Sequence, residues 1–277
     1  MKKNAILFLI LCTVSFASKA QYFYKDIVSN KQVLADMSAY KQNKVKVINI
    51  KSIEPDGTAS EGFFCQKKIN NDYSKSSLFT RSDMSGASML TSAFNKKGLL
   101  LKTHDSSAIS VSTNLYRYDD SDRIVSILSV IRSQDDDFTN QIMEEHIYQY
   151  NQNGQPEKMT RVKNKKDSTV ILFGLDENKR VAIEKDTRSG TKYYYYYDAK
   201  NRLTDIVQEN DFKTRMLPDY IFDYNNSSGL LSQMTTTEEG GNYYFVWKYT
   251  YDNGLRLKER CYSKERRLLG SIEYEYK

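Results

Sequence analysis

The 277-residue chain has few of the residue types that build catalytic and metal sites. It contains two histidines, His104 and His146, with three cysteines and three prolines. It has no HExxH motif, no cysteine pair at metal-ligand spacing, no GxSxG elbow and no glycine-rich phosphate loop. We therefore expect a non-enzymatic protein with no catalytic residues, no metal and no cofactor.

Long hydrophobic runs are absent beyond the first twenty residues. Lys2 and Lys3 precede an apolar run over 5–14, and Ser18-Lys19-Ala20 forms a small-x-small cleavage site. The apolar run is shorter than the roughly 20 residues that a membrane-spanning helix needs. Residues 1–20 are therefore predicted to be a signal peptide that exports the protein to the periplasm, the outer-membrane surface or the exterior.

The charge balance gives no reason to expect a nucleic-acid partner. Loss of Lys2, Lys3 and Lys19 with the signal peptide lowers the formal net charge from +6 to +3. Nucleic-acid-binding domains carry a much larger basic excess. Two cysteines remain, Cys65 and Cys261, and in an oxidising compartment a disulfide and two free thiols are equally open alternatives.

Aromatic residues are abundant and favour β structure. The sequence has 22 tyrosines, and aromatic residues make up 13% of the chain. Tyrosine suits a pleated surface that is half buried and half wet. The exception is the segment 21–43, where Val33, Met37 and Tyr40 recur at helical spacing. We expect a short amphipathic helix there, covering an exposed sheet edge, and a β domain over 44–277.

Clear repeats begin at about residue 94 and continue to the end of the chain. Each unit has an aromatic or aliphatic residue followed by Asp or Asn, often with Arg four residues later and an aliphatic residue after it. Asp and Asn bond their own backbone two residues on, so each unit reads as a strand, a tight turn and a return strand. The repeat residues expected to shape these hairpins are Tyr118, Asp119, Arg123, Tyr150, Asn151, Asp176, Arg180, Tyr197, Asp198, Arg202, Leu203, Tyr224, Asn225, Tyr251, Asp252 and Arg256.

The stretch Tyr197-Asp198-Ala-Lys-Asn201-Arg202-Leu203 resembles the YD repeat of RHS-type proteins, whose pattern is Tyr-Asp-x-x-Gly-Arg-Leu. The family glycine is replaced by Asn201 here, and by Asp122 and Leu255 in two other units. The resemblance implies a long antiparallel sheet, which in that family sometimes closes into a shell around a toxin. This chain has too few repeats for a shell, so we expect an elongated antiparallel β-meander. The signal segment and the repeats also resemble small uncharacterised secreted envelope proteins of the Bacteroidetes type.

The two faces of the predicted sheet lead to two functional hypotheses. Period-2 geometry places the paired aromatics on one face and Tyr194 and Tyr196 on the other, either in a doubly covered part of the sheet or as a binding surface. The favoured function is binding to another envelope protein through the sheet surface or through the final strand, 271–276, as an exposed edge. The alternative is glycan binding by Tyr194, Tyr196 and Trp247.

An outer-membrane barrel is disfavoured by the sequence. The return strand that starts at Arg256 carries charges on both faces, and one face of a membrane barrel must meet lipid. We therefore expect a protein that is not integral to the membrane.

Overall fold

The computed structural model describes residues 22–135, 141–209, 218–238 and 243–277. The predicted signal peptide lies outside the described residues. Within them, one helix precedes eighteen strands, which confirms a mainly β protein. The helix α1 spans Lys25–Gln42. The strands are β1 (Val47–Ile53), β2 (Phe64–Ile69), β3 (Lys75–Ser82), β4 (Gly86–Phe94), β5 (Leu100–Ser107), β6 (Ser110–Tyr118), β7 (Ile124–Ser133), β8 (Gln141–Tyr150), β9 (Pro156–Lys163), β10 (Asp167–Leu175), β11 (Val181–Asp186), β12 (Lys192–Tyr197), β13 (Leu203–Glu209), β14 (Tyr220–Tyr224), β15 (Leu231–Thr237), β16 (Tyr244–Asp252), β17 (Leu255–Ser263) and β18 (Leu268–Tyr276).

The strands form a closed barrel. Every strand pairs antiparallel with its neighbours in sequence, and β1 pairs with both β2 and β18. The closing register runs from Ile48 opposite Tyr276 to Ile53 opposite Ser271. The predicted elongated, open meander is therefore wrong, although the order of strands is that of a meander. The reason is that β1 supplies the last strand with a second partner and satisfies the backbone groups of both ends.

Closure also removes the predicted edge strand. Residues 271–276 belong to β18, which pairs with β17 on one side and β1 on the other. Neither edge of β18 has a free line of backbone N–H and C=O groups with which another strand could pair. Binding by strand addition at this position is therefore excluded.

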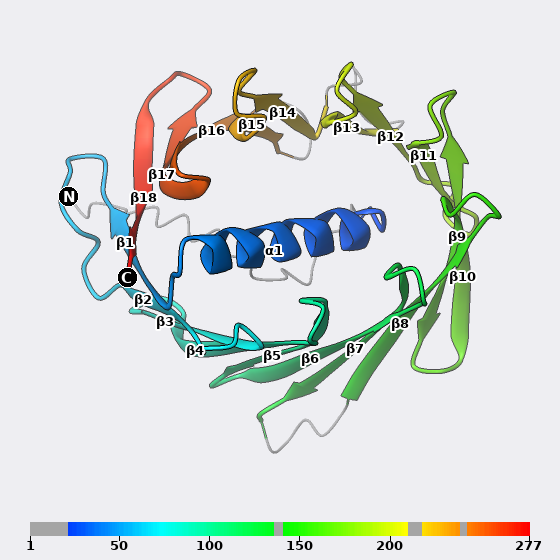
Figure 1. Ribbon diagram of the computed structural model, residues 1–277, viewed down its shortest axis with the longest axis horizontal. Helices are drawn as coiled ribbons and strands as arrows, with labels where there is room; N and C mark the ends of the chain where they lie inside the picture. The colour runs from blue at the N-terminus through cyan, green and yellow to red at the C-terminus, as the bar shows by residue number, and fades with distance from the viewer. Residues whose placement is uncertain (1–21, 136–140, 210–217, 239–242) are drawn as a thin grey trace.

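The helix α1 lies inside the ring of strands and runs across it (Figure 1). This corrects the prediction that the helix covers a sheet edge, because the closed sheet leaves no edge there to cover. An 18-stranded ring is too wide for its own side chains to fill, and a helix about 10–12 Å across occupies the middle. The helical stripe that includes Val33, Met37 and Tyr40 packs on wall residues such as Phe94 and Leu100.

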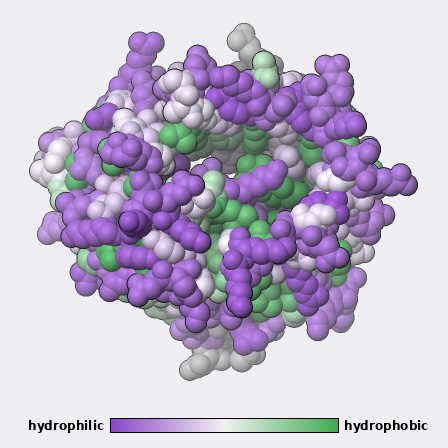
Figure 2. Space-filling view, viewed as in Figure 1, coloured by the Kyte–Doolittle hydropathy of each residue, from purple (hydrophilic) through white to green (hydrophobic). Residues whose placement is uncertain are grey.

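The aromatic side of the sheet faces this lumen. Tyr193 and Tyr195 of β12 are buried against Tyr22, which precedes α1, with ring centroids about 6 Å apart. Tyr220 of β14 meets the same Tyr22 ring edge-on. Viewed in the same direction, hydrophilic residues surround the rim and hydrophobic ones line a hollow near the centre (Figure 2). The ladder of aromatics thus finds its partner layer in the N-terminal segment.

The repeat turns share one side-chain arrangement, of which Asp198 gives an example. Its Oδ1 accepts the backbone N–H of Lys200 and of Arg202, and its Oδ2 accepts the guanidinium of Arg202 at 2.6–2.7 Å. The guanidinium lies 4.6 Å from the ring centroid of Tyr224, in the next hairpin. The Tyr224 hydroxyl donates to the carbonyl oxygen of Leu203. Two other units have the same Asp–Arg ion pair, Arg–Tyr ring contact and Tyr hydroxyl bond to a backbone carbonyl. They are Asp119 with Arg123 and Tyr150, and Asp176 with Arg180 and Tyr197.

The residues that replace the glycine of the YD pattern explain how the turns still form. Asn201 and Asp122 adopt φ of 62° and 59°, a left-handed conformation that these two residue types tolerate. In the unit with Leu255, the two preceding residues, Asn253 and Gly254, take φ of 47° and 79°. Leu255 itself therefore does not need a positive φ.

Both remaining cysteines are buried as free thiols, Cys65 in β2 and Cys261 in β17. Burial raises the pKa of both thiols, that of Cys261 to about 12. Of the two alternatives left open by the sequence, the structure contains the free thiols. Among the described residues, we find no helix with the length and apolar character needed to cross a bilayer.

Candidate functional site

A buried carboxylate on the barrel wall holds the start of α1. Glu184 of β11 is 2% exposed. Its Oε1 accepts the backbone N–H of Phe23 and its Oε2 accepts that of Tyr24 and the Tyr195 hydroxyl, each at 2.8 Å. Burial raises the pKa of this carboxyl, and the three donated hydrogen bonds oppose the rise. Tyr24, the N-cap, makes no side-chain capping bond, so the wall supplies the anion that a helix N-terminus attracts.

A second anchor lies beside it, where His146 of β8 sits between two carboxylates. Its Nδ1 is 2.6 Å from Oδ2 of Asp26, in the first turn of α1, and its Nε2 is 2.9 Å from Oε1 of Glu144. Both ring nitrogens donate only when the imidazole is protonated. Burial opposes that charge, but the carboxylates of Asp26 and Glu144 outweigh it and raise the pKa of His146 to about 9.

The surrounding residues complete the network, which we name the helix-anchor cluster: Glu184, Asp26, His146, Glu144, Arg161, Tyr148 and Tyr195. Arg161 of β9 lies 3.3 Å from Glu144, and the Tyr148 hydroxyl donates to Asp26 at 2.8 Å. The hydrogen bond from His146 lowers the pKa of Glu144. Each charge in the cluster thus has a partner of the opposite sign or several hydrogen-bond donors, as buried charges require.

The chemistry open to this cluster is limited. A general base needs a free nitrogen and a pKa near the working pH. His146 is charged at neutral pH and both of its nitrogens are engaged by carboxylates. The cluster is therefore suited to holding α1 against the wall. Across the described ranges, no group of three or more His, Cys, Asp or Glu side chains is arranged to hold a metal ion.

Sequence reasoning found only part of this cluster. The alternation of His146 with Tyr148 and Tyr150 places it on the aromatic face, and that is where it lies. Glu184 and Asp26 were missed, because their partners are 161 and 120 residues away in the chain. Along β11 Glu184 alternates with Ala182 and Asp186, so the local sequence gives no signal for its burial.

The three residues predicted to bind a partner or glycan do not lie together. Tyr194 and Tyr196 of β12 point outward, and Tyr196 is 53% exposed. The Tyr194 hydroxyl donates to Glu209 of β13 at 2.8 Å. Trp247 of β16 faces the lumen, where it is 6% exposed and packs with Tyr249 and Cys261.

The outer face of the barrel differs from one side to the other. Residues that lie opposite one another in the strand register share a face of the sheet. Along each strand, residues on the outer face alternate with residues that face the lumen. On this basis one outward region is rich in apolar side chains, with Glu145, Lys158, Lys185 and Asp205 interspersed. We name it the apolar outer sector: Val111, Leu115, Leu128, Val130, Ile147, Val162, Val170, Leu172, Ile183, Tyr194 and Tyr196.

The opposite side of the barrel carries charges outward. Lys51 of β1 pairs with Glu275 of β18 at 3.7 Å, and Lys258 of β17 pairs with Glu273 of β18. Exposed Lys248 of β16 lies on the same outer side. The barrel is thus amphipathic around its circumference.

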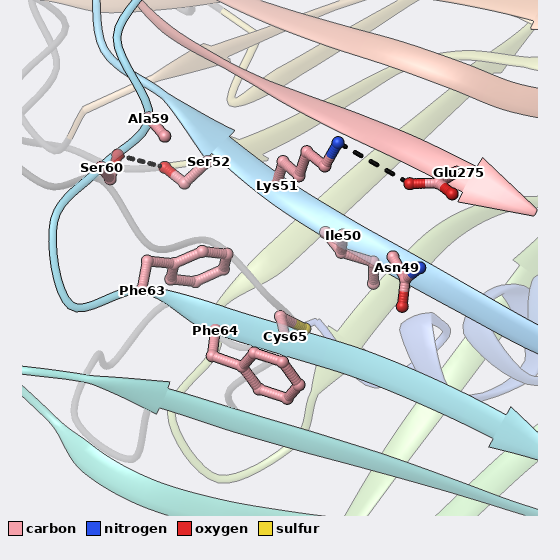
Figure 3. A pocket seen from close by; sticks show the side chains of 10 residues that line it. All are labelled: Asn49, Ile50, Lys51, Ser52, Ala59, Ser60, Phe63, Phe64, Cys65 and Glu275. Atoms are coloured by element: carbon pink, nitrogen blue, oxygen red, sulfur yellow. Dashed lines mark hydrogen bonds and ion pairs between the residues drawn. The ribbon is translucent and has the colours of Figure 1, made fainter.

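A small pocket of about 330 Å³ opens between β1, β2 and the loop that joins them (Figure 3). The ion pair of Lys51 with Glu275 borders it, and the Phe63 and Phe64 side chains form another part of its lining. Two pairs of polar groups drawn there bond to each other: Lys51 with Glu275, and the Ser60 hydroxyl, which donates to that of Ser52 at 2.8 Å. The Asn49 side chain accepts from Gln66. This pocket offers few unused polar groups to a ligand.

Comparisons with known proteins give only distant likenesses. No family model matches the sequence, and no curated protein matches it. A porin-like protein from Bacteroides uniformis matches with a TM-score of 0.42 at 12% identity, over 84% of this chain and 96% of that one. One from Bacteroides vulgatus matches with a TM-score of 0.32 at 12% identity, over 84% and 98%. The TcdB2-TccC3 structure matches with a TM-score of 0.33 at 12% identity, over 80% of this chain and 13% of that one. At these TM-scores the likenesses do not establish a family for this chain.

Proposed function

We propose that this protein is a non-enzymatic protein of the cell envelope that binds another envelope protein through its apolar outer sector. The observation that carries the proposal is the exposure of large apolar side chains in that sector. Leu115 is 39% exposed, Leu172 43% and Tyr196 53%. Contiguous exposed apolar surface on a protein is typical of an interaction site, and the exported location follows from the signal-like segment 1–20.

The occupant we propose is a protein rather than lipid. A lipid-embedded barrel is apolar all round, and each Lys or Arg at the bilayer midplane costs about 2–4 kcal/mol. Lys258 and Arg260 flank the middle of β17 and face outward, as does Glu273 of β18. The apolar surface thus covers one side of the barrel only, which suits a partner of limited width.

Of the two routes expected from the sequence, the proposal keeps the sheet surface and drops the final strand. Because β18 pairs on both sides, the contact is made by side chains of the sheet face and not by a strand edge. The glycan alternative needs a row of exposed rings, and Trp247 is buried in the lumen. Tyr194 and Tyr196 instead join the apolar outer sector.

Site-specific photo-crosslinking in cells tests the proposal. A photoreactive phenylalanine analogue replaces Tyr196 in the apolar outer sector, and the matched control replaces Thr250, which faces outward on the charged side. We expect a discrete crosslinked adduct at position 196, absent at 250 and lost when Leu172→Lys is added. Adducts of equal yield at both positions, or none at 196, would contradict the proposal.

A further inference from the structure

A second surface feature lies on the outer face of β2 to β5, beside the edge of the apolar outer sector, where Lys102 of β5 lies opposite Leu115 of β6 (Figure 1). It is a groove of about 610 Å³. Its floor is made by the short side chains of Ser77, Thr91 and Ala93, on β3 and β4. Longer side chains stand on both sides of this floor, so the groove results from residue size on an otherwise regular sheet.

The strand register fixes which residues form the two walls. Lys68 of β2 lies opposite Ser77, which lies opposite Thr91, which lies opposite His104 of β5. One step along, Lys75 of β3 lies opposite Ala93, which lies opposite Lys102 of β5. Neighbouring strands are about 4.8 Å apart, so the backbones of Lys75 and Lys102 are separated by roughly 10 Å. Lysine side chains span such a gap easily from both sides.

The groove is positively charged. Its lining contains Lys68, Lys75 and Lys102 and no Asp or Glu. Some other surface lysines of this barrel are paired, as Lys97 is with Asp122 and Lys192 with Glu209. Within the described ranges none of the three groove lysines has an ion-pair partner.

His104 adds a directed hydrogen-bonding group to the same wall. Its Nδ1 is 2.9 Å from the hydroxyl oxygen of Thr113 on β6, which fixes the orientation of the ring. Its Nε2 has no hydrogen-bond partner in the described part of the chain. The hydroxyls of Ser77 and Thr91 lie between this ring and the lysines of the opposite wall.

We propose that this groove binds a small organic phosphate. Lysine ammonium groups bind phosphate oxygens as point charges, and such charge-assisted hydrogen bonds are stronger than neutral ones. Lys68 and Lys75 contact the phosphate from one wall, and Lys102 and His104 from the other. The Ser77 hydroxyl bonds the hydroxylated body of the ligand, and the Thr91 hydroxyl, which donates to the carbonyl oxygen of His104 at 3.3 Å, accepts a hydrogen bond from it. The site borders the proposed protein-binding surface at Lys102 and Leu115, and the proposal does not depend on that surface.

Binding measurements on the whole mature chain test this site. The probe is fructose 1,6-bisphosphate, followed by isothermal titration calorimetry at low and at physiological salt. We expect saturable binding that weakens with salt, as for exposed charges. The double variant K75Q/K102Q should bind roughly tenfold more weakly or worse, because two charged hydrogen bonds are lost.

The matched control is K185Q/K248Q, which removes the same charge from exposed outward lysines of β11 and β16. This control should bind as the unchanged protein does, and both variants should melt at the same temperature. Equal weakening in the two double variants, or no binding at millimolar probe, would overturn the proposal.

A further arm separates two sources of the phosphate. Vesicles of phosphatidylcholine with one-fifth phosphatidylglycerol are sedimented with the protein and with K75Q/K102Q. Sedimentation that depends on the groove lysines assigns the site to a lipid headgroup. Binding of the sugar phosphate without sedimentation assigns it to a soluble phosphate ester.

Discussion

His146 illustrates, for a single residue, how the barrel wall holds a charged group away from water. Its side chain is 9% exposed, and both ring nitrogens face carboxylates. Protonation of the His146 imidazole is therefore more favourable in the folded chain than in the unfolded chain. Because one of the carboxylates belongs to Asp26 of α1, this preference couples the protonation of His146 to the attachment of the helix.

This coupling predicts a pH-dependent stability. The pKa of His146 rises from 6.5 to about 9 on folding. The stabilisation is therefore complete below about pH 6.5 and is lost as the pH rises through about 9. Breaking a buried ion pair costs about 3 kcal/mol, so H146Q should lower the free energy of unfolding by about that amount at pH 6.5. Urea unfolding between pH 6 and 9 measures both effects.

The matched control for this prediction is H104Q. His104 is a partly exposed residue of the outer face that bonds a hydroxyl rather than a carboxylate. H104Q should keep the downward slope of stability between pH 6.5 and 9, and H146Q should flatten it. Parallel slopes in the unchanged protein and H146Q would rule out His146 as its source.

The short sequence pattern of the repeats forms each hairpin and also links it to the next one. The Asp and the turn residues of each unit bond within that unit, so the local sequence predicts the turn. The Arg of the same unit also lies on the tyrosine ring of the next hairpin, as Arg180 does on Tyr197 at 4.6 Å. The hydroxyl of Tyr197 donates back to the carbonyl of Val181. The pattern therefore links neighbouring hairpins as well as forming each one.

Substitution of Arg180 by lysine tests this link. Lysine keeps the charge but loses the planar stacking on Tyr197 and the paired contacts with Asp176. We expect R180K to lower the free energy of unfolding by about 1–2 kcal/mol, from the lost cation–π and charged hydrogen bonds. Chemical denaturation followed by tyrosine fluorescence measures the change.

R188K is the control at this scale. Arg188 pairs with Asp167, but both side chains are more than half exposed, and surface pairs of this kind contribute little. R188K should change the stability by less than about 0.5 kcal/mol. A similar loss in the two variants would show that the stacking on Tyr197 adds nothing.

At the scale of the whole molecule, the pairing of β1 with β18 decides the shape. It joins residues at the two ends of the sheet and closes the wall around α1. Without this contact the outermost strands would present unpaired backbone and the aromatic face would be open to water. Such edges promote association between chains.

Deletion of residues 268–277 tests the role of closure. The truncated chain lacks β18, so β1 and β17 lose a partner strand and Ile48 and Ile50 lose the cover of Tyr276 and Tyr274. We expect oligomers or aggregates by size-exclusion chromatography with light scattering, together with increased binding of a hydrophobic dye. A full-length chain extended by ten Gly and Ser residues is the control and should stay unchanged. A monomeric, dye-negative truncation would contradict the importance of closure.

Local sequence patterns specify the strands, hairpins and helix of this protein. Period-2 alternation of aromatics, Asp or Asn at the turns and the spacing of Val33, Met37 and Tyr40 predict strands, hairpins and one helix, because these signals act over a few residues. Closure, the position of α1 in the lumen and the helix-anchor cluster depend on contacts between distant parts of the chain. The contact of Ile48 with Tyr276 and the bonds from Glu184 to the helix start join residues more than 150 positions apart. No local pattern encodes such pairings, since they depend on the accumulated twist and curvature of the whole sheet.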